Sequence, residues 1–319
     1  MKTAVITGIT GQDGAYLSKL LIEKDYRVVG LIRSNNSVNL SGLKYLGVSE
    51  NVILEECDLN DLSQILNLLK KYHPDELYNL AAQSSVSLSF SQPIGTIQFN
   101  VLSVLNILEA IRISGLSVKF YQASSSEIFG EAELPIKENK VINPLSPYSI
   151  SKASAHWITR NYRDAYGLYS CSGILFNHES YLRGSNFFIK KVICTAIAIS
   201  RGKEHELRVG NIDIKRDFGW APKYVEAMYL MMQQEKADDF VICSGKSTSL
   251  RSIIEFVFEY LNIDKSKIIE DSAYYRPTDI KDIYGDNSKA KRILGWQYDF
   301  SFYDVLKILL EEELNNEIR

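Results

Sequence analysis

Cysteine is scarce in this chain of 319 residues, and the four cysteines are far apart. Cys57, Cys171, Cys194 and Cys243 form no C-x-x-C pair, so the sequence indicates neither a disulfide framework nor a zinc site. We therefore expect reduced core cysteines, no bound metal and a cytoplasmic location.

An excess of charge of one sign is also lacking. Lys and Arg together number 36 and Asp and Glu 39, which gives a formal net charge of −3. A chain without a basic excess has no broad electrostatic surface for a polyanion, so we expect no nucleic-acid partner.

Long hydrophobic runs are missing as well. The first residues do not follow the pattern of a secretory signal, and the longest apolar run, Val192–Ile199, is too short to span a bilayer. We therefore expect no membrane partner. The composition, 45% hydrophobic and 24% charged, is typical of a soluble chain with one large or two closely packed domains.

Short β-branched runs alternate with longer amphipathic stretches over the first 125 residues. The predicted strands are Thr3–Thr7, Arg27–Ile32, Val52–Glu56, Glu76–Leu80 and Val118–Ala123. This order predicts an α/β fold with a Rossmann-type doubly wound parallel sheet.

We expect residues 1–170 to form a dinucleotide-binding domain. Residues 171–319 show a weaker, mixed pattern without a linker and end in a predicted helix, Phe302–Glu313. They predict a smaller mixed α/β lobe that binds the substrate, with some segments returning to the first domain.

Three glycines follow the first predicted strand. Gly8, Gly11 and Gly14 stand between that strand and a helical pattern that starts at Ala15. In such a turn, backbone N–H groups and the helix dipole face a pyrophosphate without an intervening Cβ. A tight turn with no ligand is the alternative, but the order strand, loop, helix favours a dinucleotide site.

The residues that follow the second and third predicted strands indicate which dinucleotide binds. Arg33 opens the polar loop Arg33–Ser37, which favours the 2′-phosphate of NADP, although a solvated loop and NAD stay open. Asp58 follows the third predicted strand. Its carboxylate either accepts from the adenine amine or caps the following helix.

A tyrosine and a lysine stand four residues apart at the start of a predicted helix. Ser146 is the predicted N-cap and Pro147 the first helical residue, so Tyr148 and Lys152 share one face. A nearby ammonium stabilises a phenolate and makes the tyrosine a base. A surface pair is the alternative, but the hydroxyls of Ser124–Ser126 end a strand beside the cofactor crevice.

These features together resemble the extended short-chain dehydrogenase/reductase superfamily over essentially the whole chain. Several longer strings are similar to those of the GDP-mannose 4,6-dehydratase family: Tyr78–Ser84, Gln122–Glu127, Phe176–Ser180, Gly210–Asp213, Lys215–Asp217, Arg276–Thr278 and Gly285–Lys291.

The resemblance implies the roles of individual residues and a homodimer or homotetramer. The implied catalytic residues are Ser125, where the family usually has Thr, Glu127, Tyr148 and Lys152. The implied cofactor residues are Gly8, Gly11, Gln12, Asp13, Gly14, Arg33, Asp58, Leu59, Leu80, Ala81, Ala82, Tyr148 and Lys152. The implied substrate residues are Ser84, Ser85, Asn177, Lys191, Asn211, Arg216 and Arg276, with the last two arginines neutralising the diphosphate.

The chain departs from the family pattern at three places. The segment Tyr181–Ser185 replaces Pro-Arg-Arg-Gly-Glu, Ser85 replaces a His, and Arg33-Ser34 replaces a pair of arginines. The first two departures leave GDP-N-acetylglucosamine open beside GDP-mannose as the substrate. The third leaves the choice of NADP or NAD, and a tetramer, open.

The residue types suit a redox-neutral dehydration, and the resemblance implies that its substrate is a GDP-hexose. Tyr148 would take the proton of the sugar 4-hydroxyl, aided by Lys152 and Ser125, and Glu127 would then remove the C5 proton and help expel the C6 hydroxyl. An epimerase has no elimination to catalyse, so Glu127 is the discriminating residue unless it only caps a helix. A 4-ketoreductase and a non-catalytic regulator with this fold are further alternatives.

Overall fold

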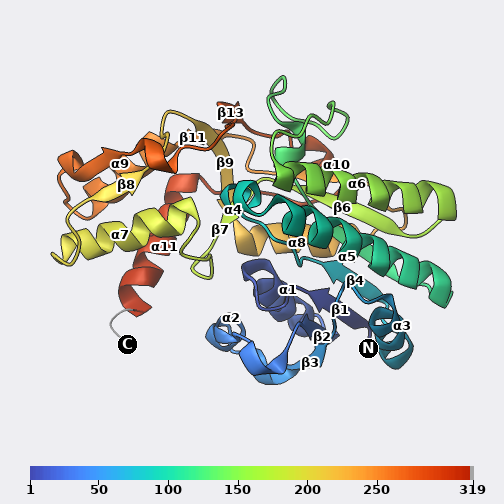
Figure 1. Cartoon of the computed structure of the whole chain (residues 1–319). Helices are drawn as coiled ribbons and strands as arrows, with labels where there is room; N and C mark the ends of the chain where they lie inside the picture. The colour runs from blue at the N-terminus through green and yellow to red at the C-terminus, as the bar shows by residue number, and fades with distance from the viewer. Residues whose placement is uncertain (317–319) are drawn as a thin grey trace.

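A parallel sheet of seven strands forms the centre of the larger part of the molecule (Figure 1). The computed structural model describes residues 1–316, apart from the side chain of Ser37, and gives the strand order β10-β6-β5-β4-β1-β2-β3 with every neighbouring pair parallel. The predicted doubly wound parallel sheet is therefore confirmed. These strands are β1 (Thr3–Thr7), β2 (Arg27–Ile32), β3 (Val52–Glu56), β4 (Glu76–Asn79), β5 (Lys119–Ser125), β6 (Ser170–Leu175) and β10 (Phe240–Ile242).

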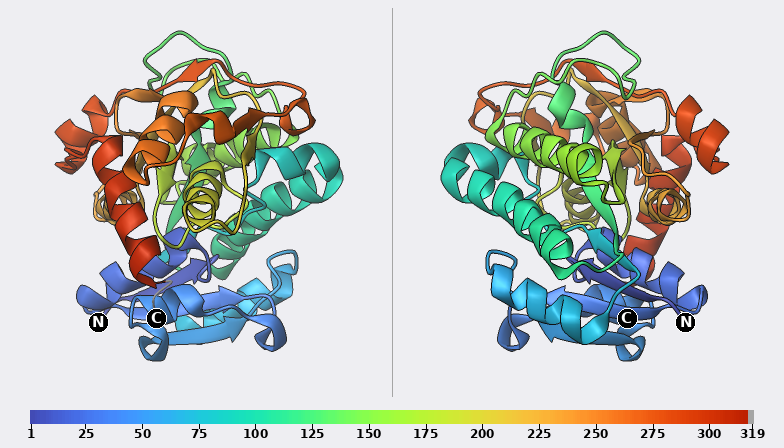
Figure 2. Two further views of the ribbon diagram at one scale, coloured as in Figure 1. Left: turned by 90° about the vertical axis from the view of Figure 1, so that its left-hand side faces the viewer. Right: turned by 90° about the vertical axis from the view of Figure 1, so that its right-hand side faces the viewer.

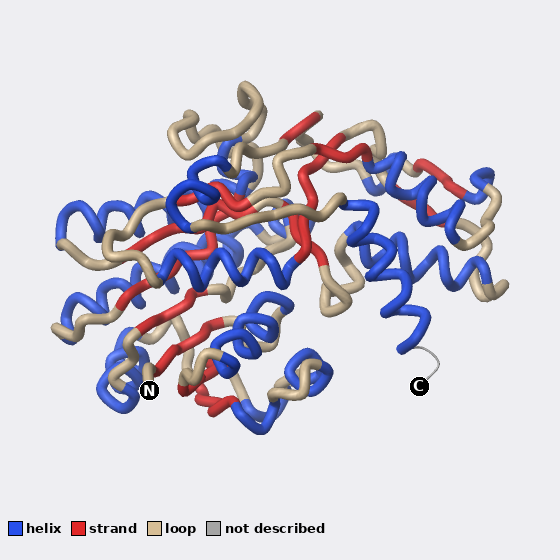
Figure 3. The backbone as a smooth tube through the Cα atoms, turned by 180° about the vertical axis from the view of Figure 1, so that it is seen from behind, coloured by secondary structure: helices blue, strands red, loops and turns tan. Residues whose placement is uncertain are grey.

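Helices cover both faces of this sheet (Figures 1 and 3). Ala4 and Ile6 of β1 pack into the core with α1 (Gln12–Glu23) and α8 (Ala221–Met232). Val5 belongs to the core on the opposite face, because successive strand side chains point to opposite sides. Three helices cover that face: α3 (Leu62–Tyr72), α5 (Pro93–Ser114) and α6 (Pro147–Tyr166).

A smaller lobe is built on a second sheet, at the left of Figure 1. Its four strands are β7 (Asn177–Glu179), β9 (Lys215–Trp220), β11 (Ser247–Ser249) and β13 (Asp282–Ile283), and β8 (Leu207–Val209) pairs separately with β12 (Ile268–Glu270). Its core lies among α7 (Phe188–Ser200), α9 (Leu250–Tyr260) and α11 (Phe302–Asn316). Three elements after residue 169 return to the large sheet: strands β6 and β10 belong to it, and helix α8 covers one face. The division of the chain at residue 170 stays a prediction.

Short helices complete the chain: α2 (Ser41–Tyr45), α4 (Val86–Ser91), α10 (Ser288–Leu294) and the 3-10 turns Asn35–Ser37, Ser49–Asn51, Ser126–Phe129, Lys265–Lys267 and Ser272–Tyr274. Strands β1 to β3 have the predicted bounds. Strand β4 ends one residue early, β5 runs on to Ser125, and the last helix continues to Asn316.

Two helix starts show how local signals act. Ser146 caps α6 as predicted, since its Oγ accepts from the N–H of Ser149 at 3.1 Å. Helix α1, however, starts at Gln12 and not at the predicted Ala15, because Gly11 is already its extended N-cap. Gly14 therefore lies inside the first turn, where a Cβ would collide with the backbone of Gly8 and Ile9.

Helix α5 is the one described helix long and apolar enough to cross a membrane, with a mean hydropathy of 1.5 over 18 residues. The longest apolar run in the sequence, Val192–Ile199, lies in α7 instead. Val104, Ile107 and Leu108 of α5 are buried in the core against the sheet. We therefore interpret α5 as a core helix. The four cysteines form no disulfide with one another; Cys57, Cys171 and Cys243 are buried as predicted, whereas Cys194 is only half-buried. No group of His, Cys, Asp or Glu within residues 1–316 is suited to hold a metal.

Candidate active site

One large cavity of about 1340 Å³ lies where the carboxyl ends of the large-sheet strands face the smaller lobe. This is where doubly wound sheets bind ligands, beside the point at which the strand order reverses. Every residue that the sequence assigned to the site lines this cavity: Gly8, Gly11, Gln12, Asp13, Gly14, Arg33, Asp58, Leu59, Leu80, Ala81, Ala82, Ser84, Ser85, Ser125, Glu127, Tyr148, Lys152, Asn177, Lys191, Asn211, Arg216 and Arg276.

The glycine loop forms a tight cradle at one end of the cavity. Gly8 has a φ of +69°, and a Cβ there would lie 2.8 Å from the backbone nitrogen of Ala81. No side chain caps the N-terminus of α1, whose first N–H groups have no partner within the helix. The loop therefore suits the pyrophosphate of a dinucleotide.

The segment after β2 carries the candidate 2′-phosphate ligand. Arg33 is exposed, and its guanidinium lies 5.9 Å from the ring centroid of Phe99. Ser34 caps the following turn by accepting from the N–H of Asn36 at 3.2 Å. The carboxylate of Glu56, at the end of β3, accepts from the N–H of Asn35. A cation and a carboxylate thus flank this part of the cavity, and the side chain of Ser37 lies outside the described residues.

Asp58 does not cap the helix that follows it. Its carboxylate accepts from the N–H of Asn60 at 2.9 Å, and the N-cap of α3 is Asp61, which accepts from the N–H of Ser63 at 2.9 Å. The capping alternative was therefore wrong, because Asp61 and not Asp58 directly precedes α3.

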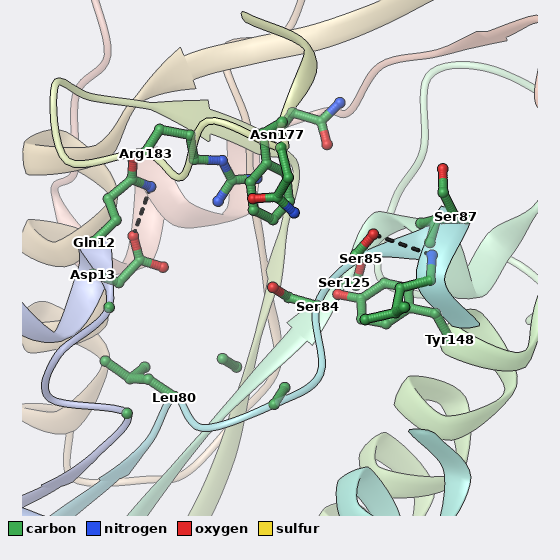
Figure 4. Close-up of a pocket in the computed structure, with 18 of the residues that line it drawn as sticks. Gln12, Asp13, Leu80, Ser84, Ser85, Ser87, Ser125, Tyr148, Asn177 and Arg183 are labelled. Atoms are coloured by element: carbon green, nitrogen blue, oxygen red, sulfur yellow. Dashed lines mark hydrogen bonds between the residues drawn. The ribbon is translucent and has the colours of Figure 1, made fainter. Parts of the chain in front are cut away.

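Tyr148 lies in the wall opposite the start of α1, with Ser125 beside it (Figure 4). Lys152 lines the same cavity. Burial raises the pKa of Tyr148 to about 12, against a hydrogen bond with Ser125 that lowers it. Burial lowers the pKa of Lys152 to about 8. The ammonium donates to the carbonyl of Ala123 at 2.8 Å and lies 5.9 Å from the centre of the Tyr148 ring. The ammonium therefore lies near the Tyr148 ring, on the same face of the helix as predicted, while its hydrogen bond goes to the strand carbonyl.

Glu127 lies in the same wall and is half-buried. The N-cap of the turn Ser126–Phe129 is Ser125, whose Oγ accepts from the N–H of Glu127 at 3.3 Å. Since Ser125 performs the capping, the carboxylate of Glu127 is not the N-cap of its turn.

The opposite end of the cavity is basic. Lys191 of α7 donates to the carbonyl of Arg208 at 2.8 Å and lies 4.3 Å from the ring centroid of Tyr274, and burial lowers its pKa. Arg216 is buried and pairs with Asp279. Arg276 Nη1 is 3.9 Å from the same carboxylate. Asp279 therefore offsets part of the positive charge expected to face a diphosphate.

The structure adds residues that the sequence analysis did not assign. The imidazole of His178 is buried against Asp13, with Nε2 2.9 Å from Oδ2, and Arg183 lines the cavity 3.7 Å from the ring centroid of Phe187. Arg183 lies in the segment that departs from the family pattern, which could have singled it out. His178 is 165 residues from Asp13, and no local signal connects them.

Comparisons with known proteins agree with this geometry. A family model described as "GDP-mannose 4,6 dehydratase" matches residues 5–309. GDP-mannose 4,6 dehydratase 1 of Arabidopsis thaliana is 43% identical over 324 residues, which cover 98% of this chain and 90% of that protein.

Solved structures support the fold. The dTDP-glucose 4,6-dehydratase of Bacillus anthracis, solved in complex with NAD, has a TM-score of 0.87 at 19% identity, with 99% of this chain and 98% of that one covered. RMD from Pseudomonas aeruginosa, solved with NADPH, has a TM-score of 0.81 at 23% identity, with 98% of each chain covered. On the full-length sequence match, this chain belongs to the GDP-mannose 4,6-dehydratase family.

Proposed function

We propose that this protein is a hydro-lyase that converts GDP-mannose to GDP-4-keto-6-deoxymannose and water. The observation that carries the proposal is that Glu127 lines the same wall as Ser125, Tyr148 and Lys152, beside the glycine loop. A full set of groups for oxidation and for elimination is thus gathered in one cavity. The family match favours this reaction over the GDP-N-acetylglucosamine, epimerase, ketoreductase and regulator alternatives.

The residues present fit a nicotinamide dinucleotide. Gly8, Gly11 and Gly14 leave room for a pyrophosphate at the uncapped start of α1, and Leu80 to Ala82 line the cavity beside them. We propose NADP rather than NAD, because Arg33 supplies a cation for a 2′-phosphate. When bound, the dinucleotide supplies a hydride acceptor at C4 and a hydride donor at C6, so that no net oxidation occurs.

The first half of the reaction needs a base at the sugar 4-hydroxyl. Tyr148 takes that proton in its phenolate form, and the hydrogen bond from Ser125 to the tyrosine oxygen favours that form. Lys152 is close enough to favour the phenolate through space, although it donates to a backbone carbonyl.

The second half needs a base at C5. The 4-ketone acidifies the C5–H bond, and the carboxylate of Glu127 takes that proton. The C5–C6 double bond forms as the C6 hydroxyl leaves, and the proton held by Glu127 converts that hydroxyl to water. Glu127 therefore serves as base and then as acid. Hydride return to C6 is completed by a proton at C5, which balances the proton that Tyr148 took from the 4-hydroxyl.

The nucleotide sugar spans the cavity in this proposal. The diphosphate would be bound by three cations, Lys191, Arg216 and Arg276. The sugar and the base would be bound by Asn177 and Asn211, which line the same side of the cavity. Ser84 and Ser85 complete the sugar side.

We also propose a cytoplasmic homo-oligomer. Large apolar side chains are exposed on neighbouring helices, Ile94, Ile97 and Leu102 on α5, and Ile150 and Trp157 on α6, with Trp157 52% exposed. Exposed apolar residues on two adjacent helices favour a second copy as the partner. A homodimer through this face is the simplest assembly, and a homotetramer stays the alternative. The reduced cysteines agree with a cytoplasmic location.

The proposal is tested by incubating the purified protein with GDP-mannose and catalytic NADP⁺, without added reductant, and scoring the product by mass. Loss of one water from many equivalents of substrate is the expected result. GDP-N-acetylglucosamine and the UDP, CDP and dTDP hexoses serve as controls. A requirement for stoichiometric NADPH, or a product of unchanged mass, would overturn the dehydratase assignment.

A further inference from the structure

An aromatic contact connects the two sides of the cavity away from the reacting groups. The ring of Tyr45, at the end of α2, stacks on the ring of Tyr181, with centroids 4.7 Å apart and planes at 30°. The hydroxyl of Tyr45 donates to Glu312 of α11 at 3.1 Å. Figure 2 shows the end of α11 reaching the blue segments that include α2. A single side chain of the dinucleotide side thus contacts two segments of the smaller lobe.

Tyr181 is also held from the other side. Lys190 donates to the carbonyl of Tyr181 at 2.8 Å, and its ammonium lies 4.2 Å from the centre of the ring. The same ammonium pairs with Glu313 of α11. The ring of Tyr181 therefore lies between Tyr45 and a lysine that is itself held by α11.

Both ends of this contact continue into the wall of the cavity. On the dinucleotide side, α2 follows the segment Arg33–Asn39, which contributes four residues to the lining: Arg33, Ser34, Val38 and Asn39. On the other side, Tyr181 is followed by Arg183 and Phe187, which also line the cavity and contact each other. Arg183 extends toward Asn177 along the same side of the cavity in Figure 4.

We propose that Tyr45 is a positioning residue that couples the two ligand sites. A dinucleotide bound against Arg33–Asn39 reduces the motion of α2. Because Tyr45 of α2 stacks on Tyr181, the segment with Tyr181 and Arg183 also becomes more ordered. A nucleoside diphosphate then binds more tightly, because the part of the cavity lining that contains Arg183 is already ordered. This is positive cooperativity without a large change of shape. The coupling is reciprocal, so the diphosphate also tightens the dinucleotide. This inference rests on the proposed function, which supplies the two ligand classes.

The test measures the coupling itself. GDP is titrated into the full chain by calorimetry with and without saturating NADP⁺, and the ratio of the two GDP affinities is the readout. In the native protein we expect a ratio of about five or more, within the usual range of coupling between sites. Tyr45→Ala should bring the ratio close to one. Tyr45→Phe, which keeps the ring and loses only the hydrogen bonds of the hydroxyl with α11, should retain most of the native ratio.

Two further variants make the test decisive. Tyr260→Ala removes an aromatic side chain of matching exposure, 39% against 38% for Tyr45, from the far end of α9 and should leave the ratio unchanged. Tyr181→Leu removes the stack from the other side and replaces Tyr45→Ala if that variant does not fold. In turnover, loss of the stack should raise KM for GDP-mannose several-fold and leave kcat nearly unchanged.

The outcomes separate the inference from the proposed function. The coupling role of Tyr45 would be overturned if the native protein bound GDP equally tightly with and without NADP⁺. It would also be overturned if Tyr45→Ala and Tyr181→Leu kept the native ratio of GDP affinities. A native protein that binds neither GDP nor NADP⁺ nor NAD⁺ would instead overturn the proposed function, and the coupling role with it.

Discussion

Asp13 and His178 form a buried ion pair between the two sides of the cavity, with Oδ2 of the first 2.9 Å from Nε2 of the second. Asp13 belongs to the first turn of α1 and His178 to β7, and Gln12 reinforces the contact by donating to the carbonyl of His178 at 3.1 Å. The glycine cradle and the smaller lobe therefore share this contact, which is an ion pair when the imidazole is protonated.

This pair should make stability depend on pH. Burial lowers the pKa of His178 and Arg183 opposes its charge, but the carboxylate of Asp13 dominates and raises the pKa overall. Burial raises the pKa of Asp13, but the imidazolium lowers it overall. The histidine contribution is complete below its unfolded pKa of about 6.5 and is lost as pH rises through the folded value; the aspartate contribution is complete above about 3.9 and is lost as pH falls.

His178→Gln should therefore destabilise the protein most between about pH 4 and pH 6.5, and less at alkaline pH, where the imidazole is neutral. The free energy of unfolding from denaturant titrations across this range is the measurement. His205→Gln, at an exposed position, is the control. An equal loss of stability at all pH values would show that His178 contributes by packing on Tyr224 alone.

Arg33→Ala should lower the ratio of NADP to NAD affinity by roughly tenfold, because a charge-assisted hydrogen bond to the 2′-phosphate is lost. Fluorescence titration of both dinucleotides gives the ratio. Arg27, an exposed arginine at the opposite end of β2, provides the matched Arg27→Ala control. If both variants keep the native ratio, the segment after β2 does not select the cofactor.

Tyr148→Phe should abolish the first half-reaction. Without the phenol oxygen, no base stands at the sugar 4-hydroxyl, and turnover should fall roughly 10²–10⁴-fold. Transient reduction of the nicotinamide, followed by absorbance at about 340 nm, should disappear as well. Tyr166→Phe, on the exposed part of the same helix, should behave as the native protein. Retention of cofactor reduction by Tyr148→Phe would place the base elsewhere.

Glu127→Gln should block the second half-reaction only. The amide keeps the shape of the carboxylate but cannot take the C5 proton, so reduced nicotinamide should accumulate and persist on adding GDP-mannose. Exchange of the C5 hydrogen in heavy water should also slow markedly. The exposed Glu131 offers the control Glu131→Gln. Dehydration at the native rate by Glu127→Gln would contradict the assignment and favour an epimerase or a reductase.

Trp157→Glu should weaken the proposed oligomer, because it places a charge among the exposed apolar residues of α5 and α6. Sedimentation velocity should show a native dimer or tetramer and a smaller species for the variant. Tyr260→Glu, at an exposed aromatic residue on α9, should sediment as the native protein. A monomeric native protein would contradict the use of this face.

Local sequence signals predicted much of the framework. The bounds of β1, β2 and β3 agree with the β-branched runs, and Ser146 caps α6 as expected, because periodicity and capping act over a few residues. The predicted start of α1, Ala15, was wrong because it depends on a contact outside the helix. Whether a glycine belongs to a loop or to a first helical turn depends on the backbone of Gly8, against which Gly14 packs.

The sequence alone determined that the polar motifs would meet, because the carboxyl ends of parallel strands share one edge of a sheet. Only the tertiary structure decided how these groups pair. Lys152 donates to Ala123 rather than to the phenol, Asp13 pairs with a histidine 165 residues away, and Tyr45 stacks on Tyr181. The first contact follows from the packing of α6 on β5, and the other two follow from the packing of the smaller lobe on the large sheet. Packing of this kind brings together side chains between which the chain carries no local signal.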